Sequence, residues 1–233
     1  MLFLAVFLGF LAENLRESNV EKSREKEYVF SMVEDLVHDS MKITEDLPYL
    51  ETLQNGLDTL VHQCYLSIKG IADHRLMYFT YHHYCRGWKD IKLYDKTLIQ
   101  LKNSGNMRLI NNSIADTLSH IDAAIQFYND QLQRMLDAQN KAVEKGLDIF
   151  DYGEYEKANT NTNGLMNVND QGFRNLGYDP SLIKNDSLDI KAFISRVGFF
   201  RNYVITMISI DKEALPGLQH YIEFLRDSYH LKH

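Results

Sequence analysis

The sequence predicts an all-α protein, and three features favour this fold class. The chain has 233 residues but only 3 prolines and 12 glycines, so long helices can run without interruption. Residues 113–146 place apolar side chains at alternating spacings of four and three, which is the seven-residue repeat of helices that pack like coiled coils. No segment of useful length alternates apolar and polar residues with the period of two that strands require. We therefore expect a long antiparallel helical bundle with coiled-coil-like packing.

The first element, residues 1–12, is an uninterrupted apolar run, MLFLAVFLGFLA, and predicts a membrane anchor. A hydrocarbon core about 30 Å thick needs roughly 20 helical residues, so a run that rises about 18 Å is interpreted as the end of a span. A signal peptide is disfavoured because this sequence shows no basic leader and no A-x-A-like cleavage site, and an interfacial helix is disfavoured because no polar face exists. The side chains expected to contact lipid are Leu2, Phe3, Leu4, Val6, Phe7, Leu8, Phe10 and Leu11.

Residues 13–27 are mostly polar or charged, with opposite charges three positions apart, and predict a solvated helical stalk. From residue 28 an apolar stripe of helical period begins, which predicts a core helix over residues 28–46. Pro48 suits the first turn of a helix, so we expect a separate second helix over residues 48–69. The predicted division of the chain is a partial transmembrane anchor (1–12), a charged stalk (13–27) and a helical domain (28–233).

The middle of the chain predicts three further helices. Residues 74–85 form an unusually aromatic segment, and residues 88–103 end before Gly105, which suits the left-handed conformation that closes a helix. Residues 113–146 open with Ser113 as the expected N-cap. This last helix carries the heptad seam, which is a candidate surface for interaction with another helix. The seam consists of Ile114, Leu118, Ile121, Ile125, Tyr128, Leu132 and Met135.

An irregular loop is expected over residues 152–186, because Asn, Gly, Asp and Thr are frequent there. Two helices follow, over residues 188–209 and 211–230, and predict an αα-hairpin. One hypothesis is that the polar loop residues 159–178 and the aromatic residues 78–88 together form a pocket for a small polar ligand. The simpler interpretation is a surface excursion without a ligand.

Composition and charge exclude several classes of protein. Hydrophobic residues make up 45% and charged residues 24% of the chain, which is ordinary for a folded domain and atypical of a disordered or polytopic membrane protein. The net charge of −7 and the lack of a basic run argue against a nucleic-acid partner. Cys64 and Cys85 follow no metal or redox spacing, so we expect buried thiols, although an oxidising compartment would permit them to pair.

The strongest candidates for metal chemistry are His82 and Cys85, which lie three residues apart on one expected helix and can face the same ion. A zinc or iron site needs three or four ligands, and one helix supplies only two, so packing within the aromatic segment is the favoured interpretation. The sequence contains no Glu-x-x-His pair, Gly-x-Ser-x-Gly elbow, phosphate loop or dinucleotide fingerprint. We therefore expect no catalytic residue, no cofactor and no enzymatic activity.

Three strings, FLGFLAENLRESNVEKSREKEY, LKNSGNMRLI and FLRDSYHLKH, resemble the opening, middle and end of an uncharacterised bacterial family of single-pass membrane-anchored helical proteins, a domain of unknown function. In such proteins an apolar span is followed by a charged helix and later by a Leu-Lys-x-Ser-Gly turn. The resemblance brings no activity with it. The positions that carry it are Gly9, Glu13, Asn14, Glu25, Lys26, Glu27, Tyr28, Leu101, Lys102, Ser104, Gly105, Leu109, Ile110, Tyr229 and Leu231.

The resemblance implies a bacterial inner-membrane protein whose domain faces the periplasm, because similar proteins have a fuller span with basic residues before it. In this sequence the basic residues only follow the apolar run, and the positive-inside rule alone would place the domain in the cytoplasm. We expect a non-enzymatic, membrane-tethered protein that binds other proteins or itself in the cell envelope. The alternative is a ligand-sensing helical bundle in which the polar loop and the aromatic residues form the pocket.

Overall fold

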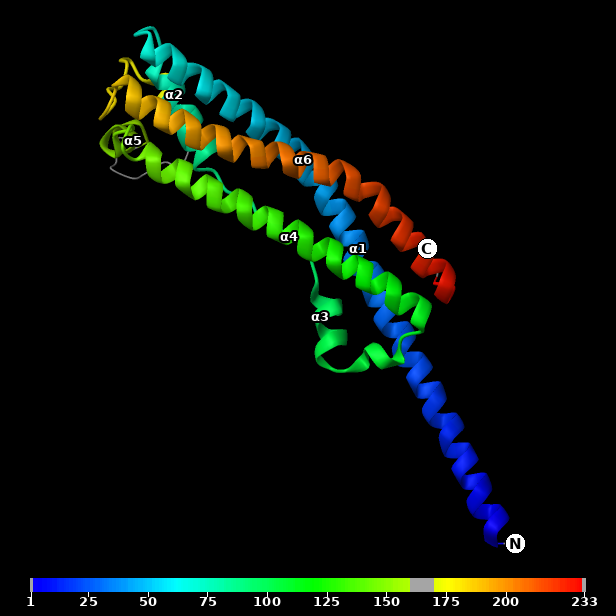
Figure 1. Cartoon of the computed structure of the whole chain (residues 1–233). Coiled ribbons are helices and arrows are strands. Elements are labelled where there is room, and N and C mark those ends of the chain that lie inside the picture. Colours follow the sequence, from blue (N-terminus) through cyan, green and yellow to red (C-terminus); the bar gives the residue numbers. More distant parts are fainter. Residues whose placement is uncertain (1, 160–169, 232–233) are drawn as a thin grey trace. The chain divides into compact units, whose positions relative to one another are not determined.

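The computed structural model describes residues 2–159 and 170–231, and its regular elements are all helices, so the predicted all-α class is confirmed. Within these residues the one sheet-like contact is an isolated antiparallel bridge between Phe150 and Leu182. The elements in chain order (Figure 1) are α1 (Leu2–Ile68), α2 (His74–Thr80), the π-helical turn η1 (Tyr81–Cys85), α3 (Lys96–Asn103), the 3-10 turn η2 (Asn106–Leu109), α4 (Asn112–Gly146), α5 (Tyr152–Asn159), the 3-10 turn η3 (Asp170–Asn175) and α6 (Ser187–Tyr229).

The chain divides into two compact units, and each of the long helices α1, α4 and α6 contributes residues to both. Unit 1 comprises the described residues among 1–44, 92–129 and 212–233, and unit 2 comprises those among 45–91 and 130–211. Each unit therefore buries side chains that are far apart in the sequence.

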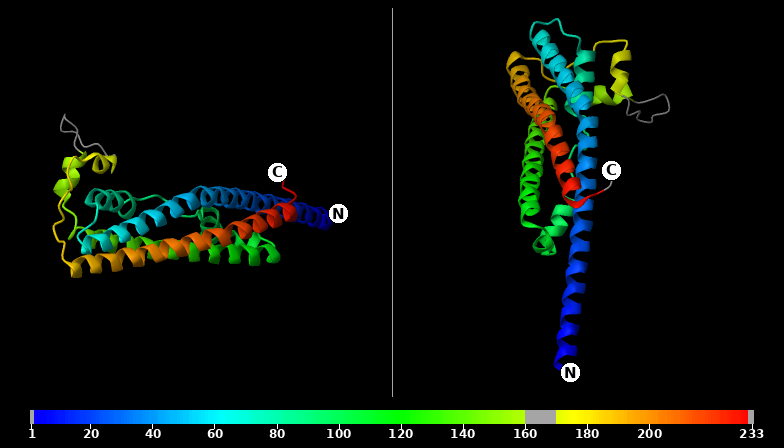
Figure 2. Two further views of the ribbon diagram at one scale, coloured as in Figure 1. Left: turned by 90° about the horizontal axis from the view of Figure 1, so that it is seen from above. Right: turned by 90° about the vertical axis from the view of Figure 1, so that its right-hand side faces the viewer.

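Unit 2 brings segments of α1, α4 and α6 side by side (Figures 1 and 2). Arg201 of α6 forms an ion pair with Asp58 of α1, and Lys145 of α4 contacts Asp189 of α6 at 2.9 Å. Large apolar side chains fill the space between the helices, and burial of each contributes roughly 1.5–3 kcal/mol. The fully buried ones include Leu50, Leu57, Leu60, Met77, Tyr78, Tyr81, Phe173, Phe193 and Phe200.

The core of unit 1 is mostly aliphatic, with Tyr128 as a buried aromatic residue. It combines α1, α3, α4 and the C-terminal part of α6, and the Tyr229 hydroxyl of α6 donates a hydrogen bond to Glu25 of α1. Lys102 of α3 forms an ion pair with Asp122 of α4 at 2.5 Å. The buried residues of this unit include Val29, Met32, Leu36, Ile43, Leu98, Leu101, Leu118, Ile121 and Leu225.

The structure corrects two predicted helix breaks, one before Pro48 and one near residue 210. Pro48 lies inside α1, and α6 runs without a break across residue 210, so the separate helix from residue 48 and the hairpin near residue 210 are both wrong. A second proline, Pro216, also lies inside α6. A helix-interior proline costs about 3 kcal/mol because its backbone offers no N–H and its ring meets the preceding turn. Buried side chains on both sides of each proline offset that cost by keeping the helical backbone in contact with neighbouring helices, for example Ile43 and Leu50 around Pro48.

The predicted helix over residues 88–103 is only half correct, because α3 begins at Lys96. Its first turn is capped from another helix: Asp35 of α1 accepts a hydrogen bond from the Thr97 backbone N–H at 3.1 Å and another from the Thr97 hydroxyl. The preceding residues 87–95 have no regular secondary structure, and Ile91 and Leu93 among them are buried. A cap supplied by a residue 62 positions away leaves no local signal in the sequence.

Glycine and asparagine set several helix ends. Gly70 after α1 and Gly105 after α3 have φ of 71° and 68°. The left-handed closure expected at Gly105 is therefore confirmed, and Gly70 ends α1 in the same way. The start of α4 differs from the prediction, because Asn111 and not Ser113 provides the capping oxygen, which accepts from the Ser113 backbone N–H at 3.1 Å. The expected irregular loop 152–186 contains α5 and η3, and its residues 160–169 lie outside the described residues.

Candidate functional site

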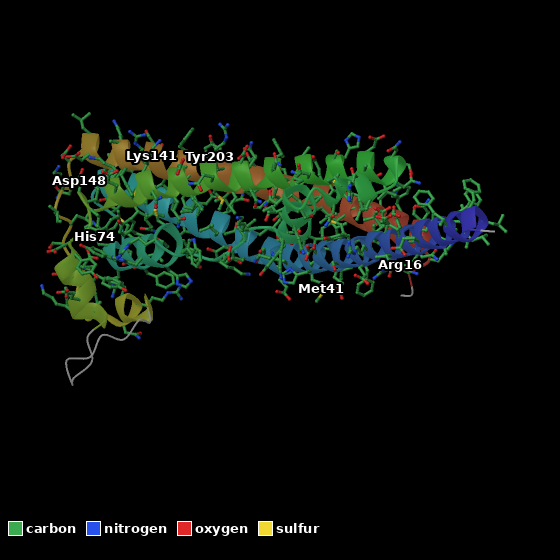
Figure 3. The ribbon with its side chains drawn as sticks, turned by 90° about the horizontal axis from the view of Figure 1, so that it is seen from below. Arg16, Met41, His74, Lys141, Asp148 and Tyr203 are labelled. Carbon is green, nitrogen blue, oxygen red and sulfur yellow. The ribbon has the colours of Figure 1, made fainter. Side chains whose placement is uncertain are left out.

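The apolar segment at the start of α1 is exposed rather than packed against the rest of the described chain. Its side chains from Phe3 to Leu11 are 41–82% exposed on all sides of the helix, and the side chain of Leu2 lies outside the described residues. The expected charge pair of the stalk is present, since Arg16 contacts Glu13 one turn away (Figure 3). No helix within the described residues is both long and apolar enough to cross a membrane.

The heptad seam is buried inside the chain. All seven of its side chains, from Ile114 to Met135, are no more than 7% exposed. They pack against other segments of the same molecule, which follows from a repeat that keeps one face of α4 toward neighbouring helices. The prediction that this seam is an interaction surface needs correction. Its side chains are buried against other segments of the same chain and are not accessible to a second protein.

Unit 1 carries an apolar groove that the sequence analysis missed. Its floor and walls come from one face of α1, where Phe30, Val37 and Met41 recur at helical spacing, and from the C-terminal end of α6. The groove has a volume of about 400 Å³, and Phe30 and Met41 are 48% and 61% exposed. Met41 points away from the helix in Figure 3. Glu34 and Arg226 line it with opposite charges, and neither has an ion-pair partner among the described residues.

Unit 2 contains a dense aromatic cluster around His82. The imidazole ring of His82 stacks on Tyr155 with centroids 4.1 Å apart and on Phe173 at 5.4 Å. Tyr81 stacks on Phe150 at 4.2 Å. These five residues and Tyr78 are called the His82 cluster below. Because the rings contact one another directly, the cluster is part of the core of unit 2.

The other parts of the pocket proposed from the sequence are separated from the cluster or undescribed. Trp88 is 70% exposed, whereas Tyr78 and Phe79 are buried. Residues 160–169, the centre of the polar loop, lie outside the described residues. The hypothesis of a pocket built from both segments therefore gains no geometric support from the part of the chain that the structure describes.

The protonation of His82 is set by its neighbour Arg86. Arg86 Nη1 lies 2.7 Å from His82 Nδ1, and because a guanidinium only donates, Nδ1 must be the acceptor and Nε2 must carry the proton. Burial and the charge of Arg86 lower the pKa of His82 to about 3. Nε2 has no hydrogen-bond partner within the described residues.

This arrangement opposes a metal site at His82 and Cys85. Metal-bound histidines use one nitrogen as ligand and donate from the other, whereas His82 accepts at one nitrogen and is protonated at the second. Cys85 is fully buried, and burial raises the pKa of its thiol far above the ordinary value, which disfavours the thiolate that a metal needs. Among the described residues no group of three His, Cys, Asp or Glu side chains is arranged to hold an ion.

The fully buried Asp39 of unit 1 was also missed. Its Oδ1 accepts a hydrogen bond from the Tyr94 backbone N–H at 2.9 Å, and its Oδ2 has no partner among the described residues. Burial raises the pKa of Asp39 to about 6. Acidic residues on a helix usually mark a solvated face, so the sequence gives no signal for this burial. The contact that accompanies it comes from Tyr94, 55 positions away in the chain.

Comparison with known proteins identifies no relative. No protein-family model, no curated protein and no solved structure matches this chain.

Proposed function

We propose that this protein is a non-enzymatic, membrane-tethered helical protein of the bacterial cell envelope, whose domain binds another protein. The apolar segment of α1 carries the proposal. Seven large side chains between Phe3 and Leu11 are exposed on one helix, and the helix continues into both compact units. Transfer of each side chain from water to hydrocarbon is favourable by roughly 1.5–3 kcal/mol, so lipid is the environment that this surface suits.

We further propose that α1, α4 and α6 form an antiparallel bundle with coiled-coil-like packing. The seven buried heptad residues of α4 support it, since this repeat is typical of helices that cross at about 20°. The tether then joins the bundle through α1 itself rather than through a flexible linker. The inner membrane and the periplasmic side are part of this proposal and rest on the sequence resemblance.

The apolar groove of unit 1 is the surface that we propose for the partner. An amphipathic helix with apolar side chains at i, i+4 and i+7 fits it, because Phe30, Val37 and Met41 lie seven and four residues apart and so share one face of α1. A volume of about 400 Å³ accommodates a few such side chains. The unpaired Glu34 and Arg226 favour a partner helix with a basic residue at one side and an acidic residue at the other.

Vesicle flotation tests the tether. The purified chain should float with vesicles of phosphatidylethanolamine and phosphatidylglycerol, and a variant combining Phe7→Glu and Leu8→Lys should remain in the bottom fraction. Leu188→Lys is the matched control, because Leu188 is 77% exposed but lies at the start of α6. Equal flotation of the double variant, or no flotation of the original chain, would contradict the tether.

Labelling of intact cells tests the membrane side. Leu188→Cys introduces an accessible thiol, while Cys64 and Cys85 are both buried and should stay unlabelled in the folded protein. A membrane-impermeant maleimide should label the variant in intact cells if the domain is periplasmic. Labelling only after lysis would place the domain in the cytoplasm instead.

Photocrosslinking tests the groove. A benzophenone side chain at position 41 should give a discrete adduct in cells, and the same side chain at position 188 should not. Arg226→Glu, which reverses the charge beside the groove, should abolish the adduct. An adduct of twice the chain mass would identify a second copy as the partner, and equal adducts at both positions would contradict the assignment of this surface.

A further inference from the structure

Arg86 has an unusual backbone setting. It follows the π-helical turn η1, and its N–H donates to the Tyr81 carbonyl five residues earlier at 3.0 Å. A wider turn of this kind changes which side chains share a helix face, and such turns occur frequently at functional sites. The turn is held from α4, because Gln139 Nε2 donates to the carbonyl oxygens of Cys85 at 3.0 Å and Gly87 at 2.6 Å. The backbone on both sides of Arg86 is therefore fixed.

The guanidinium of Arg86 is held by three rings. Its Nη1 lies 2.7 Å from His82 Nδ1, and its central carbon lies 5.6 Å from the ring centroid of Tyr152 and 5.5 Å from that of Tyr155. Cation–π contacts of this kind contribute about 0.5–2 kcal/mol each. His82 is itself stacked within its cluster, so the guanidinium rests on rigid support.

The charge of Arg86 has no counter-charge among the described side chains. No described carboxylate pairs with it, in contrast to Arg16, Arg75 and Arg201, which each contact an acidic residue. His82 is neutral at physiological pH and uses one of the five guanidinium N–H groups. Arg86 is half-buried, and its remaining guanidinium N–H groups are held in fixed directions. These donors have no acceptor in the described part of the chain.

We propose that Arg86 is the centre of a binding site for a small soluble oxoanion, a phosphate or carboxylate group. A guanidinium matches the two oxygens of such a group in a bidentate geometry, which a lysine does not. Tyr152 is 43% exposed beside the guanidinium and offers a ring face to the organic part of a ligand. This site is independent of the proposed tether and of the groove, because its residues all belong to unit 2.

Titration of the complete, unsubstituted chain tests the proposal. Inorganic phosphate and acetate are added separately at constant ionic strength, and the Nε–Hε resonances of the arginines are followed by NMR. The Arg86 resonance should shift in a saturable manner with at least one of the two anions, and the choice of anion defines the ligand class. Arg174 is the internal control, since its guanidinium also lies over a ring, that of Phe79 at 4.0 Å, but without a histidine acceptor.

Variants sharpen the result. Arg86→Lys keeps the positive charge but removes the bidentate guanidinium geometry, so the affinity for the anion should fall at least tenfold. Arg174→Gln should leave this affinity unchanged. Circular dichroism checks that each variant is folded, and the titration of the unsubstituted chain decides the question if Arg86→Lys is unstable. Absence of saturation at Arg86 with both anions, an equal shift of Arg174, or unchanged affinity in folded Arg86→Lys would overturn the proposal.

Discussion

Asp39 on α1 receives the backbone N–H of Tyr94 at Oδ1, at 2.9 Å, and leaves Oδ2 without a described partner in a fully buried position. One turn earlier on the same helix, Asp35 receives the N–H and the hydroxyl of Thr97. Two carboxylates thus attach the chain before α3 and the first turn of α3 to α1. The desolvation penalty for the charged carboxylate is larger for Asp39, because only Asp39 is fully buried.

Asp39 should make unit 1 less stable as the pH rises from about 4 to 6. The folded carboxyl holds its proton up to a pKa of about 6, whereas the unfolded one releases it near 3.8, so the folded state loses up to about 3 kcal/mol over this range. Asp39→Asn should remove this loss and raise the free energy of unfolding at pH 7.5. Urea unfolding at pH 4 and 7.5 measures it, with the exposed Asp116→Asn as control. A pH profile unchanged by Asp39→Asn would show that Asp39 does not titrate in this range.

His82 should make unit 2 sensitive to acid, in the opposite direction. An unfolded histidine takes up a proton below about pH 6.5, while folded His82 stays neutral down to a pKa of about 3. Stability should therefore fall as the pH drops, by about 3 kcal/mol at pH 4.5 relative to pH 7.5. His82→Gln should flatten this slope, and His83→Gln, on the same turn but exposed, should not. Thermal unfolding at both pH values is the measurement, and parallel behaviour of the two variants would contradict the assignment.

Gly146 at the end of α4 should not tolerate a side chain. A Cβ there would lie 2.2 Å from Cε2 of Tyr81, whose ring is buried and stacked on Phe150. Gly146→Ala should lower the free energy of unfolding by about 1–3 kcal/mol through overpacking. Gly198→Ala, within α6 and with no atom near the added carbon, should instead raise it by about 0.5–1 kcal/mol. Denaturant unfolding compares the pair, and equal effects would mean that Tyr81 moves aside.

Asp35 should be required for the first turn of α3. Asp35→Ala removes the oxygen that receives the Thr97 N–H, and loss of a capping side chain costs about 0.5–2 kcal/mol. The amide of Thr97 should exchange faster with solvent by the corresponding factor, while amides of α4 keep their protection. Glu34→Ala is the control, since Glu34 is the neighbouring exposed acid. Unchanged exchange at Thr97 would exclude the capping role.

The candidate sites could be predicted only where the signal is local. The exposed apolar segment of α1 follows directly from its composition, and the heptad of α4 correctly marks a face that packs against other helices. The same heptad says nothing about whether the other helices belong to a second protein, and here they belong to the same chain. The contact between Arg86 and Tyr155 joins residues sixty-nine positions apart, so no spacing rule reveals it.

The sequence alone determined that this chain is helical, where its strongest apolar stripe lies, and that Gly105 ends α3, because periodicity and backbone preference act over a few residues. Only the tertiary structure decided that helices continue through Pro48 and Pro216 and that α3 starts at Lys96. Those outcomes depend on burial and on hydrogen bonds from distant residues, such as that from Thr97 to Asp35, whose free energies exceed the local preferences.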